Sequence, residues 1–283
     1  MQTETLQAGN LTWFYREALP EPQAGGQERP PVVLLHGLVS QSYSWRKVMP
    51  VLAQQGFRAI APDWIGAGRS EEPEKRQFAY SPDAFVAALG QWLDALGLGE
   101  VTLVVQGFQG SVGVQYALRH PERVHRLAIL NAPIVPEARL PWKIKQMGIP
   151  LLGEVITQDP ILVDRTLEGG GGYVVDDKDL DEYRRPFLKS SSAGRSLQAT
   201  IQGLKLKAAT AEIAAGLKTW DKPVLLAWGD RDPWLPIEQV QDLAQQLPDG
   251  KLVALAEVGH YPQEDWHEKV TEVLLPFLRR KAL

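Results

Sequence analysis

The sequence predicts an α/β protein built on a mostly parallel, doubly wound β-sheet, and two observations support this. Short apolar runs rich in β-branched residues, such as Val101–Gln106, are typical of strands buried on both faces. These runs alternate with stretches of helical periodicity, and parallel strands need a crossover connection of this kind. The chain of 283 residues is also long enough to bury about three quarters of its unfolded surface.

Along the chain, the first expected element is an edge strand at residues 10–18, which leads into a proline- and glycine-rich loop at residues 20–31. Ser81-Pro82-Asp83 predicts a helix start, because a capping residue precedes proline at the first helical position. A last helix is expected from about residue 264 to 280. Between these, strands and helices alternate, with strands at 32–36, 57–62, 101–106 and 124–130 and helices at 44–55, 82–97 and 110–119.

The alternation stops in the middle of the chain, from residue 133 to residue 217. This segment contains prolines and glycines at its start and then only weak helical patterns. We therefore expect a separate helical unit at 133–217, inserted between the core parts 1–132 and 218–283. A run of four glycines at 169–172 predicts a flexible hinge inside this unit.

Composition argues against several classes of partner and cofactor. The net charge is −4, and no basic run suggests nucleic-acid binding. The absence of cysteine excludes disulfides and thiolate metal sites, and no histidine pair has metal-ligand spacing, so no metal or other cofactor is expected. The N-terminus lacks the features of a secretory signal, and no apolar run reaches the roughly 18 residues of a membrane span. The expectation is a cytoplasmic protein without a transmembrane segment.

The most informative local pattern is the break after the strand 101–106. Gly107-Phe108-Gln109-Gly110 separates this strand from a helical stretch, and strand, sharp turn and helix form the context of a nucleophile elbow. Further motifs follow other predicted strands in the order that such a site requires. They are His36-Gly37, the turn Asp63–Ser70, Gly229-Asp230-Arg231-Asp232 and Glu257-Val258-Gly259-His260.

Taken together, these motifs resemble the α/β-hydrolase superfamily, and most closely its haloalkane dehalogenase and epoxide hydrolase branch, over roughly residues 10–280. In that branch the elbow has the pattern Val-Val-Gln-Asp-Trp-Gly-Gly or Gly-His-Ser-Met-Gly-Gly, and the next helix closes on His-Pro-Glu-Arg-Val. The closing motif is present as His120–Val124, and the ungapped spacing puts the nucleophile position on Gly107. The resemblance implies an eight-stranded-type sheet, with helices on both faces and the segment 133–217 as a helical cap.

The resemblance also implies a set of site residues. His260 matches the catalytic base, Asp232 matches its acid partner, and Gly107 is a vacant nucleophile position. The backbone N–H groups of Leu38 and Phe108 match the oxyanion hole. The expected pocket residues around this centre are His36, Gln109, Trp142 and Trp234.

Gly107 has no side chain that can attack a substrate. It does accept the strained backbone geometry of an elbow, which costs a residue with a Cβ about 1–3 kcal/mol. The family's halide-binding side chains are replaced by the hydrocarbon groups of Phe108 and Leu38, so we do not expect a functional haloalkane dehalogenase. Asn131 stands where some dehalogenases carry the acid, and Gln109 stands where the family needs a small residue.

Three hypotheses follow for the function. The first is a hydrolase-like enzyme without a covalent intermediate, in which the His260–Asp232 pair acts as a general base on a small hydrophobic substrate. The second is a pseudoenzyme that binds a ligand or a protein partner, and the third is an esterase that uses Ser111 in a shifted alignment. The intact dyad favours the first. The Val-Val-Gln-Gly-Phe elbow resembles hydrolase-like proteins of cyanobacteria and chloroplasts, which implies a lipid, isoprenoid or pigment as ligand.

Overall fold

The computed structural model describes residues 1–21 and 29–280, so most of the loop expected at 20–31 lies outside the described residues. An eight-stranded sheet crosses the molecule in the order β1-β2-β4-β3-β5-β6-β7-β8. The pairs β1–β2 and β2–β4 are antiparallel, and all other neighbours are parallel. The strands are β1 (Gln2–Ala8), β2 (Leu11–Ala18), β3 (Val32–Leu35), β4 (Ala59–Pro62), β5 (Val101–Gln106), β6 (Val124–Leu130), β7 (Val224–Gly229) and β8 (Gly250–Leu255).

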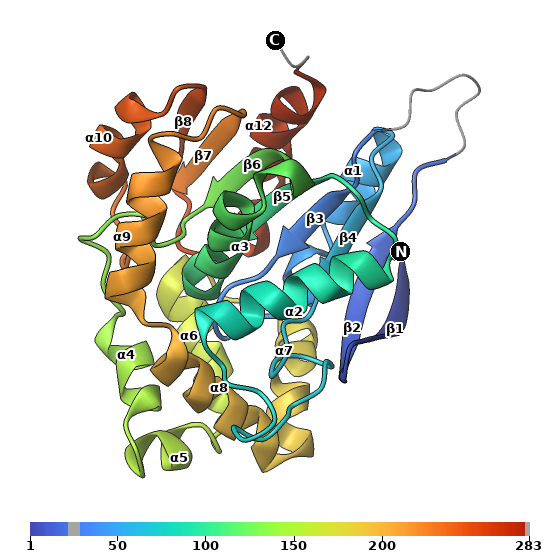
Figure 1. The fold of residues 1–283 in the computed structure, drawn as a ribbon. Coiled ribbons are helices and arrows are strands. Elements are labelled where there is room, and N and C mark those ends of the chain that lie inside the picture. The colour runs from blue at the N-terminus through green and yellow to red at the C-terminus, as the bar shows by residue number, and fades with distance from the viewer. Residues whose placement is uncertain (22–28, 281–283) are drawn as a thin grey trace.

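Helices cover both faces of the sheet, as Figure 1 shows. One face carries α2 (Pro82–Ala95), α3 (Gly107–Arg119), α9 (Leu206–Leu217) and α10 (Glu238–Gln246), and the other carries α1 (Val48–Gln54) and α12 (His267–Arg279). Each face of the sheet packs against its own hydrophobic core, and successive side chains of a strand point to opposite faces. In β3, Val33 and Leu35 pack on the α3 side, and Val32 and Leu34 pack on the α1 side. A strand buried on both faces needs apolar residues throughout, which explains the uninterrupted runs in the sequence.

The central strands agree closely with the sequence predictions, and the edge strands do not. The strand expected at the edge, residues 10–18, is β2, which pairs with β1 on one side and β4 on the other, so β1 is the edge. The strands expected at 101–106 and 124–130 are β5 and β6, residue for residue. β1 was missed because its polar sequence is mostly exposed, and β8 was missed because it is the opposite edge of the sheet and is only partly buried. The last helix is divided at Trp266 into α11 (Pro262–Asp265) and α12.

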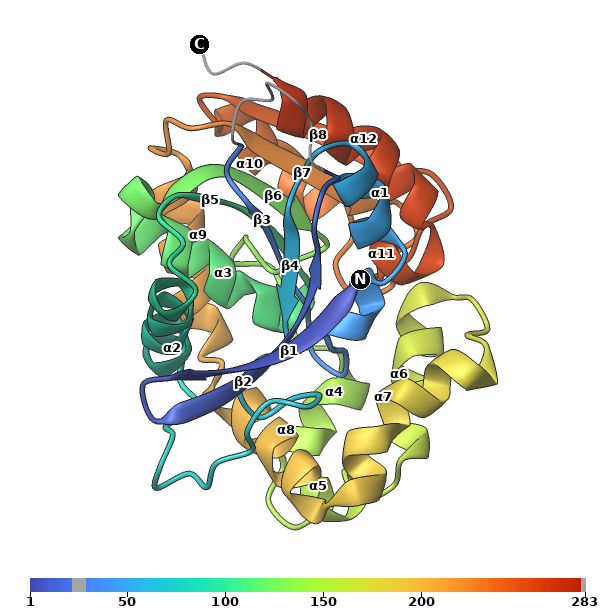
Figure 2. The same ribbon diagram turned by 90° about the vertical axis from the view of Figure 1, so that its right-hand side faces the viewer.

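The helical cap lies beyond the carboxyl ends of the parallel strands, where its residues share a cavity with the turns that follow β3 and β4 (Figure 2). One helix of the expected cap segment lies elsewhere. α9 packs along α3, where its Glu212 accepts hydrogen bonds from Gln115 at 2.6 Å and from Arg119 at 2.7 Å. The cap helices are α4 (Trp142–Lys145), η3 (Gln146–Gly148), α5 (Leu152–Ile156), α6 (Ile161–Gly171), α7 (Asp177–Lys189) and α8 (Ser191–Gly203). No helix of the described chain is long and apolar enough to cross a membrane.

The glycine run at 169–172 ends α6, and within it Gly170 makes a packing contact; the hinge role stays a prediction. The carbonyl of Gly170 accepts a hydrogen bond from the backbone N–H of His260 at 2.9 Å. A Cβ on Gly170 would lie 2.7 Å from the ring of Trp234 and 2.8 Å from the ring of Tyr261. Only glycine therefore allows α6 to approach the loop that carries His260.

Besides the Gly170 contact, a buried network of charged groups connects cap and core; we call these two contacts the cap–core joints. Arg46, which follows η1 (Ser42–Trp45), donates two hydrogen bonds to Glu264 at 2.6 and 2.7 Å and pairs with Asp179 of α7. Tyr183 of α7 donates to the same Glu264 at 2.5 Å. Both carboxylates are thus satisfied by donors that span the cap–core boundary, which fixes the position of α7 over the site.

Gly170→Ala tests whether this close approach supports the fold. The new methyl group would overlap the two aromatic rings, and overpacking of this kind costs about 1–3 kcal/mol of unfolding free energy. Gly169→Ala is the matched control, because a Cβ there meets only the end of Lys143 at 3.6 Å. Urea unfolding of both variants measures the difference, and equal stabilities would contradict the packing role.

Candidate active site

His260 and Asp232 form a buried hydrogen-bonded pair at the carboxyl ends of β8 and β7. The His260 Nδ1 to Asp232 Oδ2 distance is 2.8 Å, and the side chains are 1% and 0% exposed. Asp232 Oδ1 also accepts the backbone N–H groups of Trp234 at 2.8 Å and Leu235 at 3.1 Å. Because a carboxylate only accepts hydrogen bonds, Nδ1 carries the hydrogen, and Nε2 is left as the basic nitrogen.

Asn131 holds the acid of this pair in place. Its Nδ2 donates to Asp232 Oδ2 at 2.8 Å, and its Oδ1 accepts the N–H of Gly229 at 2.9 Å. Sequence analysis identified the position only as one that cannot supply a carboxylate. In the structure the neutral amide joins β6 to the loop after β7, which orients Asp232 toward the histidine.

Gly107 forms the sharp turn between β5 and α3, with a backbone φ of +70°. A Cβ built on Gly107 would lie 3.4 Å from His260 Nε2 and 3.0 Å from the Cα of Gly37. The basic nitrogen therefore faces the point where a nucleophilic side chain would begin. The N–H of Phe108 belongs to the first turn of α3, whose amides have no partner within the helix, so it is free to stabilise an oxyanion.

Gln106 connects three parts of the site, a role that the sequence analysis missed. The Gln106 side chain is fully buried, accepts the N–H of Gly37 at 3.2 Å and donates to the carbonyl of His260 at 2.7 Å. Gln263 donates to the same amide oxygen at 3.3 Å. The available signal was a polar residue at the end of an apolar strand, because a buried amide needs hydrogen-bond partners.

Three aromatic rings enclose the His260 imidazole. Phe108 stacks on it with a centroid distance of 5.3 Å and an interplanar angle of 28°. Trp234 and Tyr261 lie at 4.7 and 5.0 Å from the imidazole centroid. Trp234, expected from the sequence as a pocket residue, lies beside the base and does not line the cavity between cap and core, and the base has apolar surroundings.

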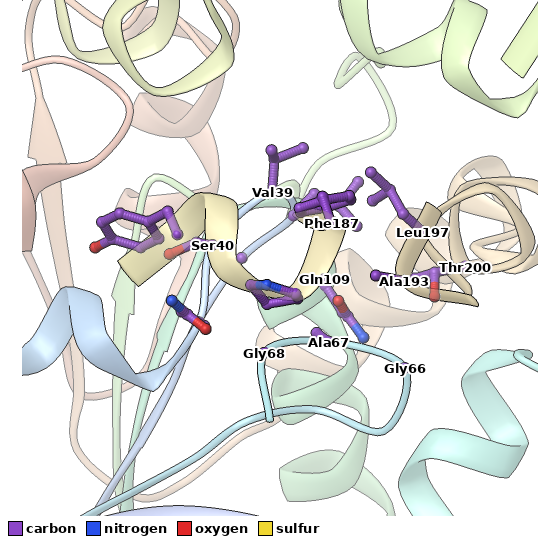
Figure 3. A pocket seen from close by; sticks show the side chains of 15 residues that line it. Val39, Ser40, Gly66, Ala67, Gly68, Gln109, Phe187, Ala193, Leu197 and Thr200 are labelled. Atoms are coloured by element: carbon purple, nitrogen blue, oxygen red, sulfur yellow. The ribbon is translucent and has the colours of Figure 1, made fainter. Parts of the chain in front are cut away.

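A small cavity lies between cap and core (Figure 3). Its volume of about 30 Å³ has room for roughly two waters. It is bordered by the Gly37–Gln41 turn, the Gly66–Gly68 turn and Gln109 from the core, and by α7 and α8 from the cap. Neither Gly107 nor His260 borders it. Within the described chain, Gln109 Nε2 and Ser40 Oγ are buried without a hydrogen-bond partner, so each can bind a polar group of a ligand.

Three other candidates from the sequence lie outside the cavity. Trp142 is 64% exposed on α4 and was wrongly assigned to the pocket. His36 is fully buried. Its Nδ1 donates to the Gly37 carbonyl at 2.8 Å, and its Nε2 accepts the N–H of Trp64 at 3.1 Å. Burial lowers the pKa of the His36 imidazole. The Ser111 hydroxyl donates to the Phe108 carbonyl at 2.7 Å inside α3, which gives no support to a shifted elbow.

The described residues contain no group of three acidic or histidine side chains that could hold a metal ion.

Asp265 is a further, partly buried acid behind the His260 loop. Its Oδ2 accepts the N–H of Gly259 at 3.2 Å. Burial above all, together with the nearby charges of Glu264 and Asp232, raises the pKa of Asp265 to about 7 against the opposing effect of the Gly259 hydrogen bond. The loop that presents His260 is therefore sensitive to the protonation of a neighbouring carboxyl.

Comparison with known proteins identifies the family. Residues 30–265 match the family model of the alpha/beta hydrolase fold. The chain belongs to the α/β-hydrolase family. This α/β-hydrolase is similar to a haloalkane dehalogenase of Mycobacterium marinum, with 31% identity over 261 residues that cover 89% of this chain and 85% of the relative. It is also similar to a cis-3-alkyl-4-alkyloxetan-2-one decarboxylase of Xanthomonas campestris, with 29% identity over 272 residues and 89% of both chains covered.

A solved structure supports the same placement. The crystal structure of a haloalkane dehalogenase from Bradyrhizobium elkani superimposes on this α/β-hydrolase with a TM-score of 0.82 and 26% identity, covering 98% of this chain and 97% of that one. The resemblance therefore includes the cap as well as the sheet. The fold and its place near the dehalogenase branch agree with the expectations from the sequence.

The raised pKa of Asp265 predicts how stability changes with pH. A folded-state pKa of about 7, against the usual 3.8, means that the folded protein binds this proton more tightly than the unfolded chain. The stabilising contribution is complete below about pH 4 and is lost as the pH rises toward about 7. Asp265→Asn should remove this part of the pH dependence and be more stable than the wild type above pH 7. Urea unfolding of both proteins across this range measures it, and parallel pH profiles would contradict the assignment.

Gly107→Ala tests the strain at the elbow. Positive φ costs a residue with a Cβ about 1–2 kcal/mol, and the contact with Gly37 adds to this. Gly97→Ala is the matched control, since Gly97 has a φ of +67° and a Cβ there would meet nothing within 4 Å. Thermal or urea unfolding should show a larger loss of unfolding free energy for Gly107→Ala than for Gly97→Ala. An equal loss in the two variants would mean that the elbow has room for a side chain.

Proposed function

We propose that this α/β-hydrolase is an enzyme that uses the His260–Asp232 pair as a general base on a small hydrophobic substrate and forms no covalent intermediate. The observation that supports this most directly is the position of His260 Nε2, which is 3.4 Å from where a Cβ on Gly107 would lie. A base so placed can act on a water or on the substrate itself in the space that a nucleophile would otherwise occupy.

For an ester or lactone, the reaction has two proton transfers. Water attacks the carbonyl carbon while its proton passes to His260 Nε2, and Asp232 stabilises the imidazolium that forms. The N–H groups of Leu38 and Phe108 stabilise the negative charge on the carbonyl oxygen. When the tetrahedral intermediate collapses, Nε2 returns the proton to the leaving alkoxide, so the enzyme ends as it began.

The cavity supports an apolar substrate with one polar group. Most of its lining is hydrocarbon, including Leu38, Phe187 and Leu197, and the side chains of Gln109 and Ser40 add buried polar atoms without a hydrogen-bond partner within the described chain. Dehalogenation fits poorly, because Gly107 supplies no carboxylate and the side chains of Leu38 and Phe108 supply no halide donor. Any ester or lactone, and still more a lipid, isoprenoid or pigment, is larger than a cavity that holds roughly two waters, so substrate binding requires movement of the cap.

A second candidate function is binding without catalysis, either of a hydrophobic ligand or of a protein partner. The observation that favours it is the enclosure of His260, since Phe108 stacks on the imidazole and the cavity does not reach the ring. In this case the dyad acts as a buried hydrogen-bonded element of the core. The two candidates differ in whether removal of the base changes a reaction rate.

The test of the catalytic proposal is hydrolysis of p-nitrophenyl acetate by the purified protein. We expect slow turnover without a burst, and a loss of about 10²–10⁴-fold in His260→Ala, the usual contribution of a general base. Gly107→Ala should also lower the rate, because its methyl group takes the space of the attacking water. An unchanged rate in a folded His260→Ala protein would contradict the proposal.

A gain-of-function variant separates the two candidates. Gly107→Ser supplies an attacking hydroxyl, and Gln109→Gly relieves crowding in the first turn of α3. If the dyad is poised for catalysis, the double variant should show a burst of acyl-enzyme that His260→Ala abolishes. If the double variant folds and binds the ester but shows no burst, the binding function replaces the catalytic one.

A further inference from the structure

Arg16 of β2 is a buried cation without a partner. Its side chain and backbone together are only 8% exposed. The Nε atom is buried without a hydrogen-bond partner, and no carboxylate of the described chain forms an ion pair with the guanidinium. Arginine is rarely buried in proteins unless it is paired, because burial removes the hydration of the charge. Arg16 therefore lacks the acceptor that its burial requires.

Two aromatic rings contact the Arg16 guanidinium. Its Cζ lies 5.5 Å from the ring centroid of Phe14 and 5.1 Å from that of Tyr43. The rings attract the positive charge, but they offer no ordinary acceptor to its N–H groups. Burial lowers the pKa of Arg16, and the nearby carboxylates of Asp63 and Glu182 do not fully offset this. The N–H donors are thus left for an external acceptor.

A second arginine approaches the same ring. The Cζ of Arg69 lies 4.4 Å from the Phe14 centroid, so the two guanidinium carbons are no more than about 10 Å apart. Arg69 is exposed, and within the described part of the chain its side chain forms no ion pair. A phosphate group that accepts hydrogen bonds from two guanidinium groups holds their carbons about 8 Å apart. The exposed side chain of Arg69 can close this small difference.

A groove lies beside the two arginines. It has a volume of about 290 Å³ between β2, the turn after β4 and α7 of the cap. Phe14 and Arg69 border it from the core, and Arg185 and Lys189 border it from α7. Gly68, labelled in Figure 3, separates the groove from the internal cavity, because it borders both. An anion in the groove would therefore contact core and cap at once.

The carboxylates that line the groove or act on Arg16 are engaged by other groups. Asp63 accepts two backbone N–H groups at 2.6 and 2.7 Å. Glu182 pairs with Arg185 at 2.8 Å, and Glu72 accepts the hydroxyl of Ser192. These carboxylates reduce the net charge of the region, but they take none of the side-chain donors of the two unpaired arginines. The preference for an anion comes from those free donors.

We propose that Arg16 and Arg69 bind the phosphate group of a phosphate monoester in this groove. A phosphate group offers three strong acceptor oxygens, which can receive two guanidinium groups from different directions. The two oxygens of a carboxylate match one guanidinium fork. The rest of the groove has room for the organic part of the ester. Binding here uses neither the His260–Asp232 pair nor the oxyanion hole, so it stands apart from the proposed function.

The experiment combines thermal unfolding and titration calorimetry of the full-length protein with inorganic phosphate and with glycerol 1-phosphate. Sodium chloride and sodium acetate at equal ionic strength are the references. Both phosphates should raise the Tm in a saturable way, and the references should not. Arg69→Met should weaken phosphate binding by about tenfold, the usual effect of losing a charge-assisted hydrogen bond. Because Arg69 is exposed, this variant should fold as the wild type does.

Arg16→Met distinguishes anion binding from a structural role. Without phosphate the variant should be at least as stable as the wild type, because it removes a buried charge that has no partner. In saturating phosphate it should be the less stable of the two. Arg76→Met is the matched control and should respond to phosphate as the wild type does, since Arg76 is 80% exposed and pairs with the exposed Glu74.

Three results would overturn the proposal. The first is that phosphate stabilises the wild type no more than chloride does. The second is an unchanged phosphate response in folded Arg16→Met or Arg69→Met protein. The third is stronger binding of acetate than of either phosphate, which would assign the arginines to a carboxylate.

Discussion

At the centre of the molecule, the ends of β3 and β5 meet where Gly37 and Gly107 bring their backbones into contact. A Cβ on Gly37 would lie 2.9 Å from the Cα of Gly107, and one on Gly107 would lie 3.0 Å from the Cα of Gly37. The amide of Gln106 fixes this approach by bonding Gly37 on one side and the carbonyl of His260 on the other. The position of the imidazole relative to the vacant elbow depends on this contact.

The cap is positioned by the same loops that hold the base. α6 reaches the loop of His260 through Gly170, and α7 is held over the site by the network of Arg46 and Glu264. Both joints lie within a few residues of His260, so movement of the cap and the orientation of the base are physically coupled. A substrate larger than the present cavity would have to break contacts in one of these joints.

The sequence predicted the central strands from their apolar runs, and the resemblance of its motifs to the α/β-hydrolase family implied the relation of Gly107, Asp232 and His260. It did not predict β1, whose polar residues carry no apolar alternation, or the role of Gln106, whose partners are distant in the chain. The error at Trp142 has a similar cause, since an aromatic residue in a short helix can face inward or outward, and only the packing decides. The packing contact of Gly170 could not be predicted, because close approach and flexibility favour the same residue.

The central claim is that His260 presents an unprotonated Nε2 to the space beside Gly107 while Nδ1–H is held by Asp232. Nitrogen-15 NMR of the histidine rings, with His260 assigned by comparison with His260→Ala, reports the tautomer directly. A neutral ring with its hydrogen on Nδ1, changed by Asp232→Asn, is the predicted result. A neutral ring with its hydrogen on Nε2 would contradict the account, because the nitrogen facing Gly107 would then be a donor and could not act as a base.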